Sequence, residues 1–280
     1  MLEFQLFRIK VFPSQQRKLF EGERTRPQIL REVIESLPSA ELRAGLTWHL
    51  GNVTPVDDAS LYFRIGRTST STLEIFDEEK GSFIDQEFET APYTHVILDV
   101  EIELCAIAKK PRLSPTTGGI ARRLIRLLNE SERAVQLQAA FQIEDINDPE
   151  DFISYLKEAY SISKFWVFFT RPNAWDANEH FVKPAQKLLE AADGEKGKIE
   201  LKGQNLKAET LEAVARSAAA TGDDAGAWIK PRQRARQVRK RLRGNPVNIQ
   251  QDAVAEPEER KSLLHRMREL YQTIRGQDNE

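Results

Sequence analysis

The hydrophobic period of the sequence changes near residue 111, and this change limits the folds that the chain can adopt. From about Leu46 to Lys110, apolar residues alternate with polar ones or run continuously, in segments such as LYFRIGR, TLEIFDEE and THVILDVEIELCAIA. This pattern predicts a meander of largely antiparallel strands. Upstream, EFQLFRIKVF at residues 3–12 predicts a further strand, and TRPQILREVIESLP predicts a short amphipathic helix.

After residue 111 the sequence predicts strands and helices in alternation. Helical periods occur in TTGGIARRLIRLLNES, DPEDFISYLKEAY, NEHFVKPAQKLLEAA and LKAETLEAVARSAAA, and strand-like runs in VQLQAAFQIE, SKFWVFFT, GKIELKG and GAWIK. We therefore expect an α+β fold, with a strand-rich N-terminal half, alternating strand and helix units, and then a C-terminal basic segment and helix. The expected parts are residues 1–110, 111–230 and 231–280, which can form one continuous domain.

The charge of the chain is unevenly distributed. The formal net charge of the 280 residues is only -2. Residues 225–280 contain 13 basic and 7 acidic residues, a net charge of +6, while the remainder contains 28 basic and 36 acidic residues, a net charge of -8. An acidic body thus carries a basic C-terminal part.

The basic segment KPRQRARQVRKRLR is the strongest functional signal in the sequence. No acidic residue occurs between Ala225 and Gln251, so eight cations create a local positive field: Lys230, Arg232, Arg234, Arg236, Arg239, Lys240, Arg241 and Arg243. Arginine forks fit phosphate oxygens, and we therefore expect contact with nucleic acid, either DNA or RNA. Arg122, Arg123 and Arg126 on a predicted helix could extend this surface. Two alternatives remain: the arginines pair with the acidic body, or they form a solvated surface.

A second hypothesis is a metal-dependent nuclease. Glu200 and Lys202 in IELKG have the E-x-K form in which a carboxylate binds a divalent metal and a lysine orients the attacking water. Asp176 and Asp193 are the acids available upstream. E-x-K also occurs by chance in charged proteins. The alternative without a function is therefore an edge strand with solvated charges. Mg²⁺ is the expected cofactor under this hypothesis, and no cofactor is expected otherwise.

The C-terminal helix is a candidate for partner binding. In PEERKSLLHRMRELYQTIRG, an apolar stripe at spacings of 4, 3 and 4 residues could form a two-helix seam or a homodimer, and it consists of Leu263, Met267, Leu270 and Ile274. The alternative is that this stripe packs on the helix's own domain. A protein-assembly subunit without nucleic-acid contact is therefore a third hypothesis.

Other classes of protein are disfavoured. The single cysteine, Cys105, excludes an internal disulfide framework and a cysteine-based zinc cage, and the four histidines lack ligand spacing, so we expect no metal centre. No window has the composition of a membrane span, and the N-terminus does not have the composition of a signal peptide. We expect a cytoplasmic protein with no membrane partner.

The segment from FWVFFTRPN through GKIELKG to GAWIK combines an apolar strand ending in Pro-Asn, a helix, and paired strands that bracket another helix. In this pattern it resembles uncharacterised bacterial proteins of similar size that are encoded near phage-defence genes. The resemblance implies no functional residue. It implies an accessory protein in bacterial antiviral defence, and together with the basic segment it leads us to expect a nucleic-acid- or nucleoprotein-binding component of a defence or DNA-transaction complex.

Overall fold

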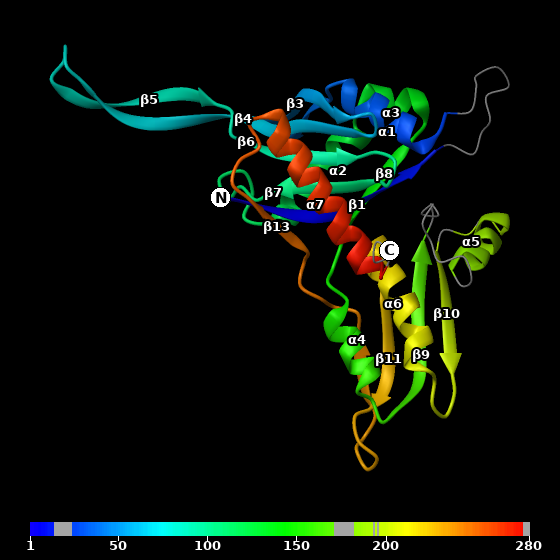
Figure 1. Ribbon diagram of the computed structural model, residues 1–280. Helices are drawn as coiled ribbons and strands as arrows, with labels where there is room; N and C mark the ends of the chain where they lie inside the picture. The colour runs from blue at the N-terminus through cyan, green and yellow to red at the C-terminus, as the bar shows by residue number, and fades with distance from the viewer. Residues whose placement is uncertain (14–23, 171–181, 193, 195, 277–280) are drawn as a thin grey trace.

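The computed structural model describes residues 1–13, 24–170, 182–192, 194 and 196–276. These residues form two antiparallel sheets and seven helices (Figure 1). The strands concentrate in the N-terminal half, and helices and strands alternate after it, so the predicted α+β class is confirmed.

The larger sheet contains nine strands of the described chain. They are β1 (Leu2–Phe12), β2 (Ser39–Arg43), β3 (Leu46–Asp57), β4 (Ser60–Asp77), β5 (Ser82–Thr90), β6 (Tyr93–Asp99), β7 (Leu104–Ala108), β8 (Ala140–Asp145) and β13 (Asn248–Gln251). Their order is β13-β1-β7-β6-β4-β3-β2, while β8 also pairs with β1 and β5 with β4. Strand β1 is central to this sheet. On one edge, β13 pairs with its first residues and β8 pairs with its last residues, while β7 pairs with its other edge.

Around β1, both faces of the larger sheet are buried, and successive side chains of the strand enter two different clusters. In β1, Phe7 and Ile9 belong to a hydrophobic cluster with α1 (Arg26–Glu35), α2 (Thr117–Asn129) and α3 (Glu132–Leu137). Phe4 and Leu6 belong to a second cluster, which includes α7 (Pro257–Arg275). The VQLQAAFQIE segment, predicted as one strand, is divided between the end of α3 and β8 because Gln138 has a left-handed conformation.

The smaller sheet has the order β10-β9-β11-β12 and extends away from the larger one (Figure 1). Its strands are β9 (Ser161–Thr170), β10 (Lys196–Lys202), β11 (Ala225–Lys230) and β12 (Val238–Arg241), and its helices are α4 (Glu150–Lys157), α5 (Val182–Ala191) and α6 (Ala208–Thr221). Side chains of α4 and α6 share a cluster with Phe165 and Val167 of β9, and side chains of α5 pack near Phe169. All three helices therefore lie on one face of this sheet.

One hydrophobic cluster joins the two sheets. It includes Leu6 of β1, Phe165 of β9 and the inner sides of α6 and α7. A buried ion pair also crosses this junction, because Lys10 Nζ lies 3.2 Å from Asp223 Oδ1 just after α6. The three-part division at residues 110 and 230 stays a prediction, and the shared cluster and strand β1 connect those parts.

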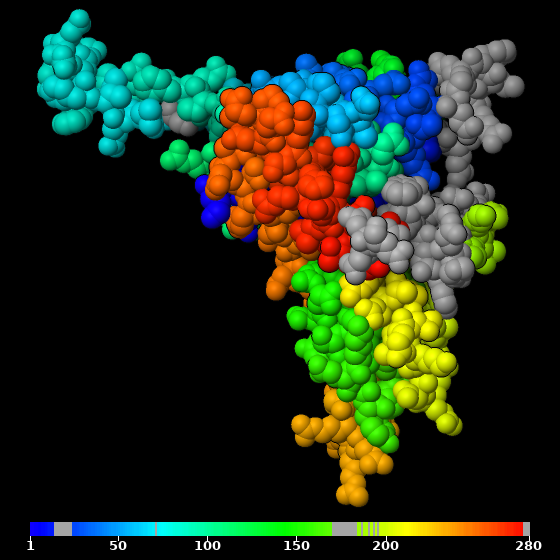
Figure 2. Space-filling view, viewed as in Figure 1, coloured from blue at the N-terminus to red at the C-terminus, as the bar shows by residue number. Residues whose placement is uncertain are grey.

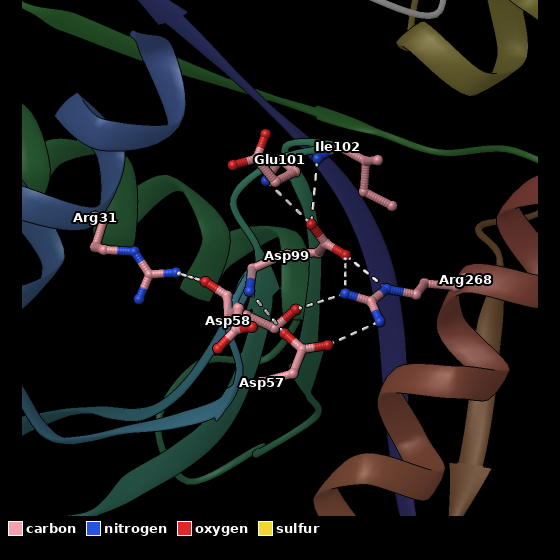
Figure 3. Close-up of polar contacts among 9 residues, drawn as sticks. Arg31, Asp57, Asp58, Asp99, Glu101, Ile102 and Arg268 are labelled. Atoms are coloured by element: carbon pink, nitrogen blue, oxygen red, sulfur yellow. Dashed lines mark hydrogen bonds and ion pairs between the residues drawn. The ribbon is translucent and has the colours of Figure 1, made fainter. Parts of the chain in front are cut away.

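The C-terminal helix α7 packs inside the molecule. Leu263, Met267 and Ile274 are buried against the chain's own core, and Leu270 is partly buried there. The stripe predicted as a partner seam is thus used internally, which was the alternative interpretation. Arg268 fixes the helix to the larger sheet, where it donates to Asp99 and Asp57 at 2.7 and 2.9 Å (Figure 3).

The second half of β4 and strand β5 form a hairpin that we call the arm, residues 69–90. Figure 2 shows the arm standing clear of the body of the molecule. It contains seven acidic residues and one basic residue, and it exposes Phe76 and Phe83. The period-two pattern predicts these strands, but it does not predict their projection from the body.

In the described part of the chain, none of the helices combines the length and apolar composition needed to cross a lipid bilayer.

Candidate nucleic-acid interface on the small sheet

The face of the smaller sheet opposite α4, α5 and α6 is here called the open face. Its residues follow from the strand register, since directly paired residues point to the same side. Trp166 of β9 pairs with Glu200 of β10 and Gly226 of β11, while its neighbours Phe165 and Val167 point to the helices. The open face consists of Lys164, Trp166, Phe168, Lys196, Lys198, Glu200, Lys202, Gly226, Trp228, Lys230, Arg239 and Arg241.

The charges of the open face are strongly unbalanced. Among its described residues are seven cations and one carboxylate, that of Glu200. Antiparallel pairing creates this excess, because it aligns lysines of β9 and β10 with arginines of β12, which are far from them in the sequence. Such a concentration produces a positive potential over the face.

Trp166 supports Arg239 at the centre of the open face. A Cβ on Gly226 would lie 2.2 Å from Cζ2 of Trp166, so only glycine allows the indole to lie this close to β11. The guanidinium of Arg239 lies 4.8 Å from the centre of the indole ring, and Trp166 is only 3% exposed. This stacking orders the arginine, which remains exposed.

Two further aromatic rings lie on the open face. Phe168 is contacted by Lys196 and Lys198, whose Nζ atoms lie 4.7 and 5.8 Å from the ring centre. Trp228 is 36% exposed, and it pairs with Lys164 on one side and Arg239 on the other. Exposed rings among cations are the combination that single-stranded nucleic acids bind, by base stacking and phosphate contact.

Glu200 is surrounded by three lysines. Its carboxylate oxygens lie 2.7 Å from Lys198 Nζ, 2.9 Å from Lys164 Nζ and 3.3 Å from Lys202 Nζ. Hydrogen bonds from Lys198, Lys164 and Lys202 lower the pKa of Glu200 to about 2. The carboxylate therefore stays ionised, and this small cluster keeps a net positive charge.

The predicted nuclease residues are only partly described by the structure. Glu200 and Lys202 do lie on one face and contact each other at 3.3 Å. Asp176 and Asp193 lie outside the described residues. Within the described ranges, no three His, Cys, Asp or Glu side chains are grouped so that they could bind a metal ion. A carboxylate engaged by three ammonium groups is also a poor cation ligand, because they compete for its oxygens.

The basic segment forms the β11–β12 hairpin. Lys230, Arg239 and Arg241 lie on the open face, and Arg232, Arg234 and Arg236 are exposed on the connecting loop, with Arg243 exposed just after β12. Lys240 points to the opposite face, where its Nζ lies 3.6 Å from the ring centre of Tyr155 in α4. Among the described residues, none of these eight cations forms an ion pair with a carboxylate. The described carboxylates of the acidic body therefore do not neutralise the segment.

The predicted arginines of α2 belong to a different part of the molecule. Helix α2 packs on the larger sheet, whereas the β11–β12 hairpin lies at the far end of the smaller sheet (Figure 1). Arg126 pairs with Glu130 at 3.0 Å, Arg123 lies 6.0 Å from the ring centre of Trp48, and Arg122 is exposed. These three residues do not join the open face in one groove.

Sequence reasoning missed Lys164, Lys196, Lys198, Trp166 and Phe168. Part of their signal was present in the sequence: alternate residues of SKFWVFFT are Lys164, Trp166 and Phe168, and those of KGKIELK are Lys196, Lys198, Glu200 and Lys202. It becomes visible only when the two strands are paired in register.

A comparison of the sequence with models of known protein families finds no match, and a search of curated proteins finds no significant similarity.

Proposed function

We propose that the protein binds single-stranded nucleic acid on the open face of its smaller sheet. The observation that carries this proposal is the seven cations, with one carboxylate, interleaved with Trp166, Phe168 and Trp228. The wider role, an accessory protein in a bacterial defence or DNA-transaction complex, depends on the resemblance in sequence.

Phosphate attraction supplies most of the binding free energy in this proposal. Each phosphate neutralised by a lysine or arginine releases condensed counterions, which favours association. Arg239 and Arg241 contribute planar forks, and Arg239 is already ordered by its stacking on Trp166. The three arginines of the connecting loop extend the positive surface beyond the strands, so that a bound backbone can continue along the hairpin.

Base stacking explains why the bound nucleic acid is single-stranded. Bases within a duplex already stack on each other, whereas unpaired bases are free to lie on exposed rings. Trp228 offers such a ring at the surface, and the guanidinium plane of Arg239 lies on the neighbouring strand. Trp166 is too buried to stack on a base, so its role is to support Arg239.

The test is the salt dependence of binding to a fluorescently labelled single-stranded oligonucleotide, with DNA and RNA as parallel probes. For single strands, each phosphate contact contributes about 0.7 to the slope of log K against log salt. The triple variant Lys202→Ala, Arg239→Ala, Arg241→Ala should bind more weakly and reduce the slope by about 2. Its matched control removes three exposed lysines elsewhere: Lys80→Ala, Lys109→Ala, Lys261→Ala. Equal slopes for the two triple variants would contradict the proposal.

Trp228→Ala separates stacking from phosphate contact. Base stacking on an aromatic ring contributes about 1–3 kcal/mol, so affinity should fall by about 5- to 150-fold with the salt slope unchanged. Trp228→Phe should restore much of the affinity. A Trp228→Ala variant that binds as tightly as the natural protein would exclude stacking at this ring.

A further inference from the structure

A cavity lined by arginines lies in the larger sheet region, away from the open face. Its volume is about 260 Å³, and it lies between the β2–β3 hairpin, β4, the loop of residues 111–115 and helix α2. Of the twelve described residues that line it, five are arginines and none is acidic; the arginines are Arg43, Arg67, Arg112, Arg123 and Arg126. Like charges around one cavity repel each other, and an anion bound between them would offset this repulsion.

Most of these arginines retain donors for a ligand. The side chains of Arg43 and Arg112 make no hydrogen bond or ion pair with another described residue. Arg123 donates to the carbonyl oxygen of Gly119 at 3.4 Å through Nη1 alone. Arg126 is the one of the five that pairs with a described carboxylate, since its Nη2 lies 3.0 Å from Glu130 Oε1.

The Nε atom of Arg67 gives independent support for a ligand. Among the described side chains it is the one buried nitrogen or oxygen atom without a hydrogen-bond partner. Arg67 lies on β4 directly opposite Trp48 of β3, and both residues line the cavity. A buried donor without an acceptor costs free energy, which an anion in the cavity would recover.

We infer that this cavity binds a phosphate group. A phosphate monoester presents three peripheral oxygens, which can accept from several arginine forks, whereas a carboxylate has two oxygens and suits a single fork. The cavity is smaller than the pockets that enclose drug-sized ligands, so it fits the phosphate and a small adjoining group. The phosphate group belongs either to a phosphorylated small molecule or to the 5′ end of a nucleic acid. This inference does not depend on the proposed function, because the two sites share no residue.

The experiment measures the thermal unfolding midpoint and the heat of binding for the full chain with inorganic phosphate, at constant ionic strength. The midpoint should rise with phosphate concentration and remain constant with chloride. Arg112→Ala, and Arg67→Lys, which keeps the charge and removes the Nε donor, should each weaken phosphate binding by about tenfold or more. Arg122→Ala is the matched control, since Arg122 lies beside Arg123 on α2 but does not line the cavity.

Two further probes identify the source of the phosphate group. Ribose 5-phosphate represents small molecules, and a pair of oligonucleotides with 5′-phosphate and 5′-hydroxyl ends represents nucleic acid. Tighter binding of the 5′-phosphate oligonucleotide, lost in Arg112→Ala, assigns the site to nucleic-acid ends, and binding of ribose 5-phosphate alone assigns it to small molecules. The open-face triple variant should bind phosphate normally, which separates this site from the other one. The absence of a phosphate-specific shift in the natural protein would overturn the inference. Shifts in Arg112→Ala and Arg67→Lys as large as that of the natural protein would overturn it too.

Discussion

The two sheets differ in how they use their faces. Both are antiparallel, but the larger sheet is buried on both sides around β1, whereas the smaller sheet is covered by described helices on one side only. In β1 of the larger sheet, Phe4 and Leu6 are buried on one face, and Phe7 and Ile9 are buried on the other. In β9 of the smaller sheet, Phe165 and Val167 face helices while Lys164 and Trp166 face outward.

The exposed face of the smaller sheet is the better candidate for a binding surface. In a sheet buried on both faces, almost every side chain packs in the core. The residue types of its strands are therefore explained mainly by stability. The open face of the smaller sheet carries cations that the core does not need, and like charges placed side by side oppose folding. These cations contribute little to packing, and their mutual repulsion lowers the stability of the fold. They are therefore candidates for binding a ligand.

The largest expected effect separates the two faces of β9. Phe165→Ala should lower the free energy of unfolding by about 3–5 kcal/mol, because it creates a cavity among α4, α6 and the sheet. Its sequence neighbour Lys164 points outward, so Lys164→Ala should change stability by less than about 0.5 kcal/mol and weaken oligonucleotide binding instead. Urea unfolding measures both variants. Similar losses of stability would show that the two faces are not distinct.

A smaller effect is expected at the glycine beneath Trp166. Gly226→Ala should lower the free energy of unfolding by about 1–3 kcal/mol and weaken oligonucleotide binding, because the added Cβ displaces the indole that supports Arg239. Gly51→Ala is the control, since a Cβ there has no atom within 4 Å. Unfolding and oligonucleotide titrations report the two effects. Normal binding by Gly226→Ala would argue that the ordered position of Arg239 is unimportant.

Glu200 gives opposite predictions for the two functional hypotheses. Glu200→Gln removes the one negative charge of the open face and frees three lysines, so nucleic-acid binding should strengthen by about threefold. The nuclease hypothesis predicts instead that the natural protein cuts nucleic acid with Mg²⁺ and that this variant does not. Weaker binding by the variant would count against the role proposed for the open face.

The smallest effect concerns the arm. Replacing residues 71–88 by an Asn-Gly turn should change the free energy of unfolding by no more than about 0.5 kcal/mol, because the exposed Phe76 and Phe83 contact each other rather than the core. Circular dichroism during urea unfolding measures this change. A loss above about 2 kcal/mol would mean that the arm belongs to the folded core.

The sequence predicts where helices and strands lie better than it predicts which face of each element is buried. Local period and turn residues were enough to anticipate β1, α2 and α7, because these signals lie within each segment. Strand β12 was missed, since four residues rich in charge have no strand period of their own, and they form a strand by pairing with β11. The sequence could not decide whether the stripe with Leu263 and Met267 contacts a partner helix or the chain's own core, because an apolar helix stripe does not show which surface covers it.

The candidate site was predicted in part for the same reason. The cations of the β11–β12 hairpin are adjacent in sequence and were identified, whereas Lys164 and Lys198 join them only through the register of three strands. Lys240 was grouped with its neighbours, yet alternation along β12 directs it to Tyr155 on the helix-covered face. The arginines of the cavity lie on separate segments, and tertiary packing alone brings them together.

Lysine footprinting shows which lysines a bound oligonucleotide covers. The protein is acetylated with a limiting reagent in the presence and absence of a saturating single-stranded oligonucleotide, and modified peptides are quantified by mass spectrometry. Protection should be confined to the open face, at Lys196, Lys198 and Lys202, while Lys80, Lys109 and Lys261 react unchanged. Saturated binding that leaves the open-face lysines fully reactive, or that protects the two sets equally, would contradict the account.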